Sequence, residues 1–407
     1  MDFLWGFIAI IVLLGIAVLF SSNRKAIRVR TVVGAFALQF LFAVLVLYTT
    51  WGQATLEFVT GVVSQAIGTS SAGIDFLFGG VYQAEGIVSV FAFEVLPVII
   101  FFSALISILY HFGIMQLVVR FLGGGISKVL KTSKVESIGA SANIFVGMTE
   151  APLAIKPYIK NMTASEMFAI MVGGMSTVAG SVMVGIAAMG IPLDYLIAAS
   201  FMSAPAGLLM AKIMMPETEL SETRNEISLE RDKSAANFID AASKGTTDGL
   251  KLAANVGAML IAFISLIALV NLFLGFLGGL MGVGDLSLEM MLGYVFAPLA
   301  FLVGVPWQEA VMAGSFIGQK TIVNEFVGFA ALSEAIDLGN VSPRTEVIAS
   351  FALCGFANLS SIAILLGGLG GLAPERRPFI AKYGPKALLA ATLVNLMNAA
   401  IAGMLVG

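Results

Sequence analysis

The sequence predicts an all-α membrane protein with eight transmembrane helices, two opposed re-entrant hairpins, an inverted repeat and interfacial helices. Three observations support this fold class. The 407 residues are 58% hydrophobic and only 12% charged, whereas a soluble domain carries about 25% charged residues. Apolar stretches of about 20 residues, the length that crosses a bilayer, recur along the chain. The basic residues are distributed unevenly between those stretches.

Eight uninterrupted apolar stretches mark the expected spans. The first follows an acidic residue rather than a basic one and is long enough to cross, so we interpret it as a retained helix and not a signal peptide. The expected spans are 3–20, 31–50, 92–112, 166–189, 194–214, 250–276, 346–366 and 386–406.

The basic residues predict the orientation. With the N-terminus outside, only Lys320 and Arg344 among the 22 Lys and Arg fall on the outer side, as the positive-inside rule requires. We therefore expect a multi-pass protein of a bacterial inner membrane with both termini periplasmic. The distribution holds only if 114–161 begins and ends inside and 286–344 begins and ends outside. Each segment is therefore predicted to form a hairpin that enters and leaves on one side, with its irregular backbone buried in protein.

The order of elements suggests an internal repeat. Hairpin, helix, helix over 126–215 recurs over 286–407 with the hairpins entering from opposite faces, so both units are predicted to form the transport domain. Residues 1–125 are mainly scaffold with interfacial helices, and 216–285 hold a charged cytoplasmic connector over 216–248 and a scaffold helix. Inverted repeats with broken segments place the binding site near the middle of the membrane.

Two glutamates lie inside the predicted hairpins. A carboxylate within a membrane segment costs about 2.5–3.5 kcal/mol and is a candidate functional group. Glu150 lies between Gly147 and Pro152, which break a helix and free backbone groups. The alternative is a hairpin near the lipid headgroups, where Glu150 meets water. Glu325 holds the matching place in the second unit, and its alternative is a salt bridge with Lys320 at the outer surface.

Two further apolar segments carry polar residues. Asn358 and Ser361 are three residues apart and are expected to share a helix face, either for binding or to join helices. Thr177 lies in a run of small residues that suits close helix packing or a local unwinding that exposes carbonyl groups. Asn143 and Thr177 supply oxygen ligands, which hard cations prefer.

The sequence lacks the features typical of nucleic-acid-binding, nucleotide-binding and metal-binding proteins. With no basic domain outside the membrane, no nucleic-acid partner is expected. The sequence contains no Walker loop and no His/Cys cluster, so we expect no cofactor besides a coupling ion.

Three sequence blocks resemble the concentrative nucleoside transporters, most closely their bacterial sodium-coupled branch. They are Asn-Ile-Phe-Val-Gly-Met-Thr-Glu-Ala-Pro at 143–152, Val-Asn-Glu-Phe at 323–326, and Phe-Ala-Leu-Cys-Gly-Phe-Ala-Asn-Leu-Ser-Ser-Ile at 351–362. The resemblance extends over essentially the whole chain. It implies a homotrimer in the lipid bilayer that imports purine or pyrimidine nucleosides with Na⁺ by alternating access, and no enzymatic activity.

The resemblance also implies the site residues. Hairpin one contacts the nucleobase, hairpin two and the 351–362 block hold the ribose, and Na⁺ binds beside hairpin one. The substrate residues are Gly147, Met148, Thr149, Glu150, Val182, Glu325, Phe356, Asn358 and Ser361, and the cation residues are Asn143, Val146, Thr177 and Val178.

Two positions depart from the family pattern. Met148 stands where the family usually has a base-contacting Gln, and a thioether lacks the donor and acceptor pair of an amide. Thr177 stands where close relatives have Ser, which keeps the hydroxyl group. Three alternatives to Na⁺ symport remain: H⁺ coupling through Glu150, a membrane-embedded enzyme acting on a lipid-linked substrate, and a channel.

Overall fold

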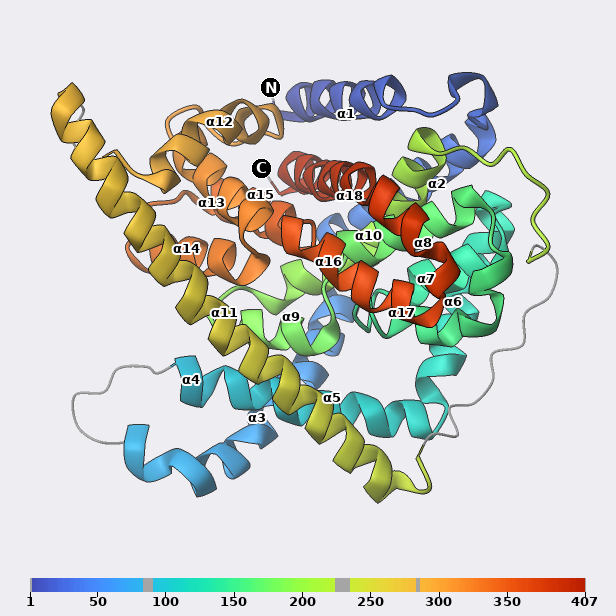
Figure 1. Cartoon of the computed structure of the whole chain (residues 1–407), viewed down its shortest axis with the longest axis horizontal. Helices are drawn as coiled ribbons and strands as arrows, with labels where there is room; N and C mark the ends of the chain where they lie inside the picture. Colours follow the sequence, from blue (N-terminus) through green and yellow to red (C-terminus); the bar gives the residue numbers. More distant parts are fainter. Residues whose placement is uncertain (1, 83–90, 224–234, 283–285, 407) are drawn as a thin grey trace.

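The computed structural model describes residues 2–82, 91–223, 235–282 and 286–406, and every regular element in these ranges is helical (Figure 1). The N-terminal part contains α1 (Asp2–Leu19), a short 3₁₀ turn (Arg24–Ala26), α2 (Val29–Ala43) with a π-helical extension (Val44–Tyr48), α3 (Thr50–Tyr82), α4 (Phe91–Glu94) and α5 (Leu96–His111).

Helix α6 (Ile114–Leu130) leads into the first predicted repeat unit, 126–215. The unit contains α7 (Lys134–Ala142), a 3₁₀ helix (Ala151–Asn161), α8 (Ala164–Ser176), α9 (Gly180–Ala187) and α10 (Leu193–Met214). Helix α11 (Phe238–Met281) follows. The second predicted unit, 286–407, contains α12 (Leu288–Leu302), α13 (Ala310–Ile322), α14 (Glu325–Asp337), α15 (Pro343–Leu353), α16 (Leu359–Gly367), α17 (Leu369–Leu372), a 3₁₀ turn (Pro374–Arg376) and α18 (Arg377–Leu405).

Six helices or helix pairs in the described ranges are long and apolar enough to cross a membrane. They are Val29–Tyr48, Phe91–His111, Ala164–Ala187, Leu193–Met214, Phe238–Leu280 and Pro374–Leu405. The other two expected spans, 3–20 and 346–366, coincide with the shorter helix α1 and with the pair α15 and α16.

The start of α11 corrects one expectation. The connector was expected to run to residue 248 and to hold at most a separate surface helix, but α11 begins at Phe238 and continues without a break into the expected span. The side chain of Asn237 caps this helix by accepting the Asp240 N–H. The first turns are polar and bind α5, whose Ser107 hydroxyl donates to the Ala241 carbonyl. A hydropathy scan detects apolar segments, so it does not detect the polar part of a helix that extends beyond the apolar part.

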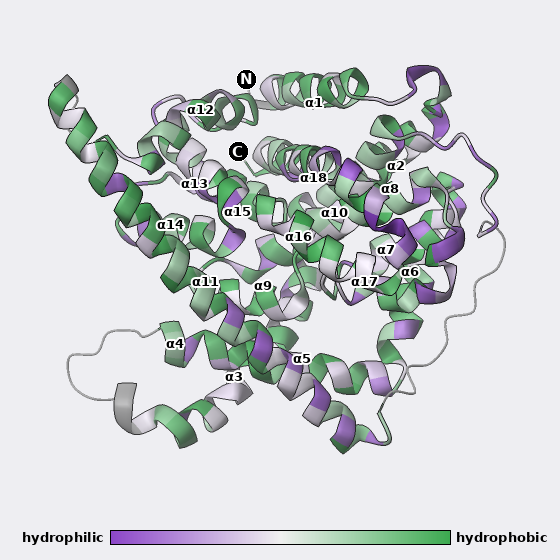
Figure 2. Cartoon of the chain, viewed as in Figure 1, coloured by the Kyte–Doolittle hydropathy of each residue, from purple (hydrophilic) through white to green (hydrophobic). Residues whose placement is uncertain are grey.

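Burial separates an inner group of helices from an outer one. Helices α8, α10 and α18 are mostly buried and pack on one another in the core, whereas α11 runs along the outside and packs mainly along α5 (Figure 1). Figure 2 shows α11 hydrophobic over most of its length. Its exposed apolar residues include Ile261, Leu269 and Phe273. Such a large exposed apolar face requires lipid or a partner rather than water.

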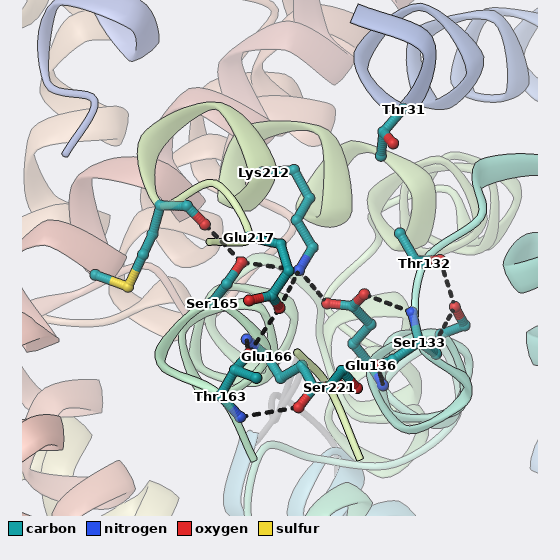
Figure 3. A network of polar contacts seen from close by, with 12 residues as sticks. Thr31, Thr132, Ser133, Glu136, Thr163, Ser165, Glu166, Lys212, Glu217 and Ser221 are labelled. Carbon is teal, nitrogen blue, oxygen red and sulfur yellow. Dashed lines mark hydrogen bonds and ion pairs between the residues drawn. The ribbon is translucent and has the colours of Figure 1, made fainter. Parts of the chain in front are cut away.

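A buried polar network fixes both ends of the segment that is predicted to contain hairpin one (Figure 3). Capping boxes start the two flanking helices, Ser133 with Glu136 at α7 and Thr163 with Glu166 at α8. Lys212, near the end of α10, forms an ion pair with Glu136 at 2.5 Å and donates to the Ser165 hydroxyl at 2.9 Å. The entry and exit of the segment are therefore held against the same end of α10.

Candidate functional site

Two helices are broken at corresponding places in the two predicted repeat units. Residues 177–179 are extended between α8 and α9, and 354–358 separate α15 from α16. The breaks lie side by side because the Phe356 N–H donates to the Thr177 carbonyl at 3.2 Å. The predicted local unwinding at Thr177 is thus present.

Glu325 lies in a buried polar cluster at the second break. It occupies the first turn of α14, where the positive end of the helix favours a carboxylate. The Asn358 side-chain amide donates to Glu325 Oε2 at 3.0 Å. Glu325, Asn358 and Ser361 are all buried. The alternative that placed Glu325 in a salt bridge at the outer surface is wrong, because Lys320 is itself buried and pairs with other groups.

Asn358 and Ser361 are joined by hydrogen bonds at a helix N-cap and not, as expected, by a shared helix face. They do not share a helix face, because Asn358 lies outside α16 as its N-cap. Its Oδ1 accepts the Ser361 N–H at 2.9 Å and the Ser361 hydroxyl at 3.0 Å. Asn is a favoured N-cap residue since its side chain satisfies a free N–H of the first turn. The cap leaves the Asn358 amide free to reach Glu325.

Glu150 lies just before the 3₁₀ helix, in the segment predicted to form hairpin one, and faces a cavity. One carboxylate oxygen accepts the Gly147 N–H at 2.5 Å, and the other lies 3.4 Å from the Thr149 hydroxyl. The side chain is exposed to a cavity of about 620 Å³, a size within the range of about 300–1,000 Å³ that is typical of ligand pockets.

The cavity is lined by the segment predicted to form hairpin one and by α5, α6, α9 and α11. Its polar residues are Ser103, Ser107 and Tyr110 from α5, Gln116 from α6, Ser181 from α9, Asp248, Lys251 and Asn255 from α11, and Glu150 from the predicted hairpin segment. A polar solute could therefore enter or leave beside Glu150. Among the described residues, no hydrogen bond joins Glu150 to Glu325 or Asn358, so the two glutamate clusters are separate.

The predicted cation residues gather where the end of α7 and the segment after it meet the break between α8 and α9. Asn143 caps the end of α7, and its amide donates to the Gly139 carbonyl at 3.0 Å. Asn143 Oδ1 is buried and has no hydrogen-bond partner, which is costly unless a ligand or ion binds it. The Thr177 hydroxyl donates to the Gly173 carbonyl at 3.0 Å, and a side chain at Gly173 would come within 3.2 Å of the Asn143 amide nitrogen. Four buried residues thus lie in or beside these two irregular segments. Asn143 and Thr177 offer side-chain oxygen atoms, and Val146 and Val178 offer backbone carbonyl groups. The residues present fit a hard cation.

The remaining predicted residues lie around these clusters. Met148 is buried and packs against Gly174, where an added Cβ would come within 2.8 Å of the Met148 Cβ. Thr149 contacts Gly368, which precedes α17. Val182 is buried in α9, and Phe356 is partly buried in the second break. Among the described residues, no hydrogen bond joins Met148 or Val182 to Glu150 or Glu325.

Two buried polar residues of the site were missed from the sequence. Lys320 in α13 and Asn395 in α18 are bonded to each other at 2.8 Å, and Asn395 also donates to the carbonyl groups of Ser176 and Cys354, both at 2.9 Å. An ionisable residue inside an apolar segment is the signal that identified Glu150, and the same signal applies to Lys320.

Three family models match consecutive parts of the chain. The model "Na⁺ dependent nucleoside transporter N-terminus" matches 8–81, "Nucleoside recognition" (Gate) matches 92–193, and "Na⁺ dependent nucleoside transporter C-terminus" matches 195–403. Together they extend over most of the chain.

Curated relatives match over nearly the whole chain. The uncharacterized transporter YutK of Bacillus subtilis is 53% identical over 100% of both chains. The nucleoside permease NupC of Helicobacter pylori is 47% identical over 99% of this chain and 98% of its own. Human solute carrier family 28 member 3 is 39% identical over 98% of this chain, which spans 59% of that longer protein.

Solved structures of CNTnw match closely in several conformations. An inward-facing, substrate-bound structure has a TM-score of 0.96 at 49% identity and covers 100% of this chain and 98% of CNTnw. An outward-facing variant has a TM-score of 0.95 at 48% identity over the same shares. An intermediate state has a TM-score of 0.97 at 49% identity, covering 100% of this chain and 99% of CNTnw.

These matches decide between the remaining function classes. They identify a nucleoside transporter with Na⁺ as its coupling ion, so the expectation that the chain is not an enzyme is confirmed. The alternative of an enzyme acting on a lipid-linked substrate is wrong. The chain belongs to the concentrative, Na⁺-dependent nucleoside transporter family.

Proposed function

We propose that this protein imports nucleosides across the bacterial inner membrane by symport with Na⁺. The observation that carries the proposal is the buried Glu325 carboxylate, held by the Asn358 amide where α15 and α16 are broken. An ionised group buried in a membrane protein needs partners, and the hydroxyl groups of a ribose are suitable donors. The family match supports the substrate class and the ion.

The ribose is proposed to bind between Glu325, Asn358 and Ser361, with Phe356 packing close. Hydrogen bonds to charged groups contribute about 1.5–3 kcal/mol each, compared with about 0.5–1.5 kcal/mol for neutral ones. Two hydroxyl groups donating to one carboxylate would therefore dominate affinity. The Asn358 cap fixes the amide beside Glu325 before the substrate arrives, which lowers the entropic cost of binding.

The nucleobase is proposed to lie against the tip of hairpin one. Gly147, Thr149 and Glu150 provide polar groups there, and Val182 provides an apolar contact. Glu150 already faces the large cavity, which makes it accessible to a solute. Met148 offers neither a donor nor an acceptor equivalent to an amide, so base preference is proposed to differ from that of relatives with Gln.

The Na⁺ ion is proposed to bind Asn143 Oδ1, the Thr177 hydroxyl and the backbone carbonyl groups of Val146 and Val178. The unpartnered Asn143 oxygen supports this assignment. Because these groups lie on both hairpin one and the first break, the ion would hold them together and favour nucleoside binding next to them. A tenfold Na⁺ gradient supplies about 1.4 kcal/mol, and 100 mV adds about 2.3 kcal/mol. At about 1.4 kcal/mol per tenfold, together they support accumulation of several hundredfold.

Transport is proposed to follow alternating access. The units 126–215 and 286–407 would move together against a scaffold formed by 1–125 and 216–285. Within each protomer of a homotrimer, eight helices cross the bilayer, two hairpins dip into it from opposite faces, and both termini lie in the periplasm. The inward-facing, outward-facing and intermediate structures of CNTnw support a mechanism of this kind.

The test is uptake of radiolabelled uridine and adenosine into proteoliposomes. At constant pH, an inward Na⁺ gradient should drive saturable uptake, and replacement of Na⁺ by choline should remove it. Preloaded nucleoside should accelerate entry by counterflow, which a channel would not show. Uptake that follows a pH gradient and ignores Na⁺ would instead establish H⁺ coupling, with Glu150 as the proton carrier.

A further inference from the structure

Lys320 is a buried lysine whose ammonium group binds the end of a helix. It lies in α13 and its Nζ donates to the Ala352 carbonyl at 3.2 Å and to Asn395 Oδ1 at 2.8 Å. Ala352 is in the last turn of α15. Carbonyl groups there have no partner within the helix, and they form its negative end. Lys320 therefore caps α15 with a positive charge.

Asn395 connects Lys320 to the first unit through hydrogen bonds. Its oxygen accepts from Lys320, while its amide donates to the Ser176 carbonyl at the end of α8 and to the Cys354 carbonyl just after α15. Asn395 and its partners are buried. One side chain on α18 thus ties together the carbonyl ends of both broken helices, with Lys320 on its far side.

The two helix ends differ in how their carbonyl groups are satisfied. Within the described part of the chain, the side chains bonded to the last turn of α8 are Ser176, Thr177 and Asn395, and all three are neutral. The Asn143 oxygen, which lies next to this turn, has no hydrogen-bond partner. The end of α15 is instead contacted by the Lys320 ammonium group.

We propose that Lys320 is a tethered cation that takes, in the second unit, the structural place that Na⁺ takes in the first. The proposal rests on the proposed function, in which Na⁺ binds at Asn143 and Thr177. Each unit then closes its broken helix with a positive charge that is held by its own predicted hairpin region. In one unit the charge is exchangeable, and in the other it is part of the chain.

The charge also supports Glu325, five residues further along the chain. The two groups attract each other electrostatically, although no salt bridge joins them. A buried carboxylate without a compensating charge is unfavourable. The positive charge of Lys320 favours the ionised form of Glu325, which is the form that accepts from the ribose, and this makes Lys320 a positioning residue. Because its charge never leaves, a single exchangeable cation is enough for each nucleoside.

The experiment uses the purified full-length protein and compares Lys320→Met, Lys320→Met/Glu325→Gln and the surface control Lys128→Met. Equilibrium binding of radiolabelled uridine and adenosine is measured against Na⁺ concentration, and the melting temperature is measured for each variant. For wild type and Lys128→Met, we expect a Hill coefficient for Na⁺ of about 1, the value for a single bound ion. For Lys320→Met, we expect at least a tenfold loss of nucleoside affinity at saturating Na⁺ and a lower melting temperature.

The double variant separates charge compensation from packing. Adding Glu325→Gln to Lys320→Met removes the uncompensated carboxylate, so the melting temperature should recover in part. The recovery is incomplete because the Ala352 carbonyl and Asn395 Oδ1 still lack the ammonium donor, and nucleoside binding should not recover. If Lys320→Met alone does not fold, recovery of folded protein in the double variant is the supporting result. Lys320→Met with wild-type affinity, or a double variant no more stable than the single one, would overturn the proposal. Failure of the proposed function is distinct, because wild type would then bind nucleoside independently of Na⁺.

Discussion

Replacing Glu325 by Gln is the perturbation that tests the substrate site most directly. The substitution preserves the size of the side chain and its place in the first turn of α14, but it removes the charge. The Asn358 amide can still donate to the new carbonyl oxygen, so the local fold at the second break should persist. The expected defect is therefore in nucleoside binding rather than in assembly.

The magnitude follows from the bonds that the carboxylate would make. A hydrogen bond to a charged acceptor exceeds a neutral one by about 1–1.5 kcal/mol. Two ribose hydroxyl groups would lose that increment together, a total of about 2–3 kcal/mol. At about 1.4 kcal/mol per tenfold, affinity should fall by roughly 30- to 150-fold. Uptake at low substrate concentration should then be close to background.

The assay is concentration-dependent uptake in proteoliposomes with a fixed Na⁺ gradient, together with equilibrium binding in detergent. Glu334→Gln is the matched control, because Glu334 lies in the same helix and is exposed. Its uptake should equal that of wild type. A Glu325→Gln protein that elutes normally and binds nucleosides within threefold of wild type would refute the assignment of Glu325 to the ribose.

Three further predictions test other parts of the molecule. Asn143→Ala removes an unpartnered oxygen, so the Na⁺ concentration for half-maximal uptake should rise at least tenfold, and an unchanged Na⁺ titration would contradict the cation site. Met148→Gln adds a neutral donor and acceptor, worth about 1 kcal/mol, and should change the ranking of purine and pyrimidine competitors by about fivefold; an identical ranking would argue against base contact. Lys212→Met leaves Glu136 buried without its ion-pair partner and should destabilise the protein by about 3–5 kcal/mol, seen as a lower melting temperature, whereas Lys128→Met at an exposed position should have little effect.

The helical membrane class could be predicted from composition. The free energy of moving a segment into lipid is largely the sum of the contributions of its own residues. Six of the eight expected spans coincide with helices or helix pairs of sufficient length, and the other two coincide with shorter helices. The break at Thr177 was one of two interpretations of a run of small residues, and the structure contains it. Boundaries were less predictable, since α11 extends into a polar region that hydropathy does not recognise as helical.

Individual site residues were predictable where polarity conflicted with the apolar surroundings. Glu150 and Glu325 stood out because a carboxylate is costly inside a membrane segment unless it has a role, and Asn143 stood out as an oxygen ligand for a hard cation. Their partners were not predictable. Asn358 reaches Glu325 across 33 residues as a helix cap, whereas periodicity had suggested a shared helix face.

The sequence by itself therefore determined the membrane class, the helical segments and the motif residues that carry the family. Only the tertiary structure decided that Lys320 is buried against α15 and that Asn395 joins two helix ends that lie 219 and 41 residues away along the chain. The physical reason is that hydropathy and helix propensity are local properties. The partner of a buried polar group depends instead on how distant segments pack, because each such group must find its hydrogen bonds within the folded protein.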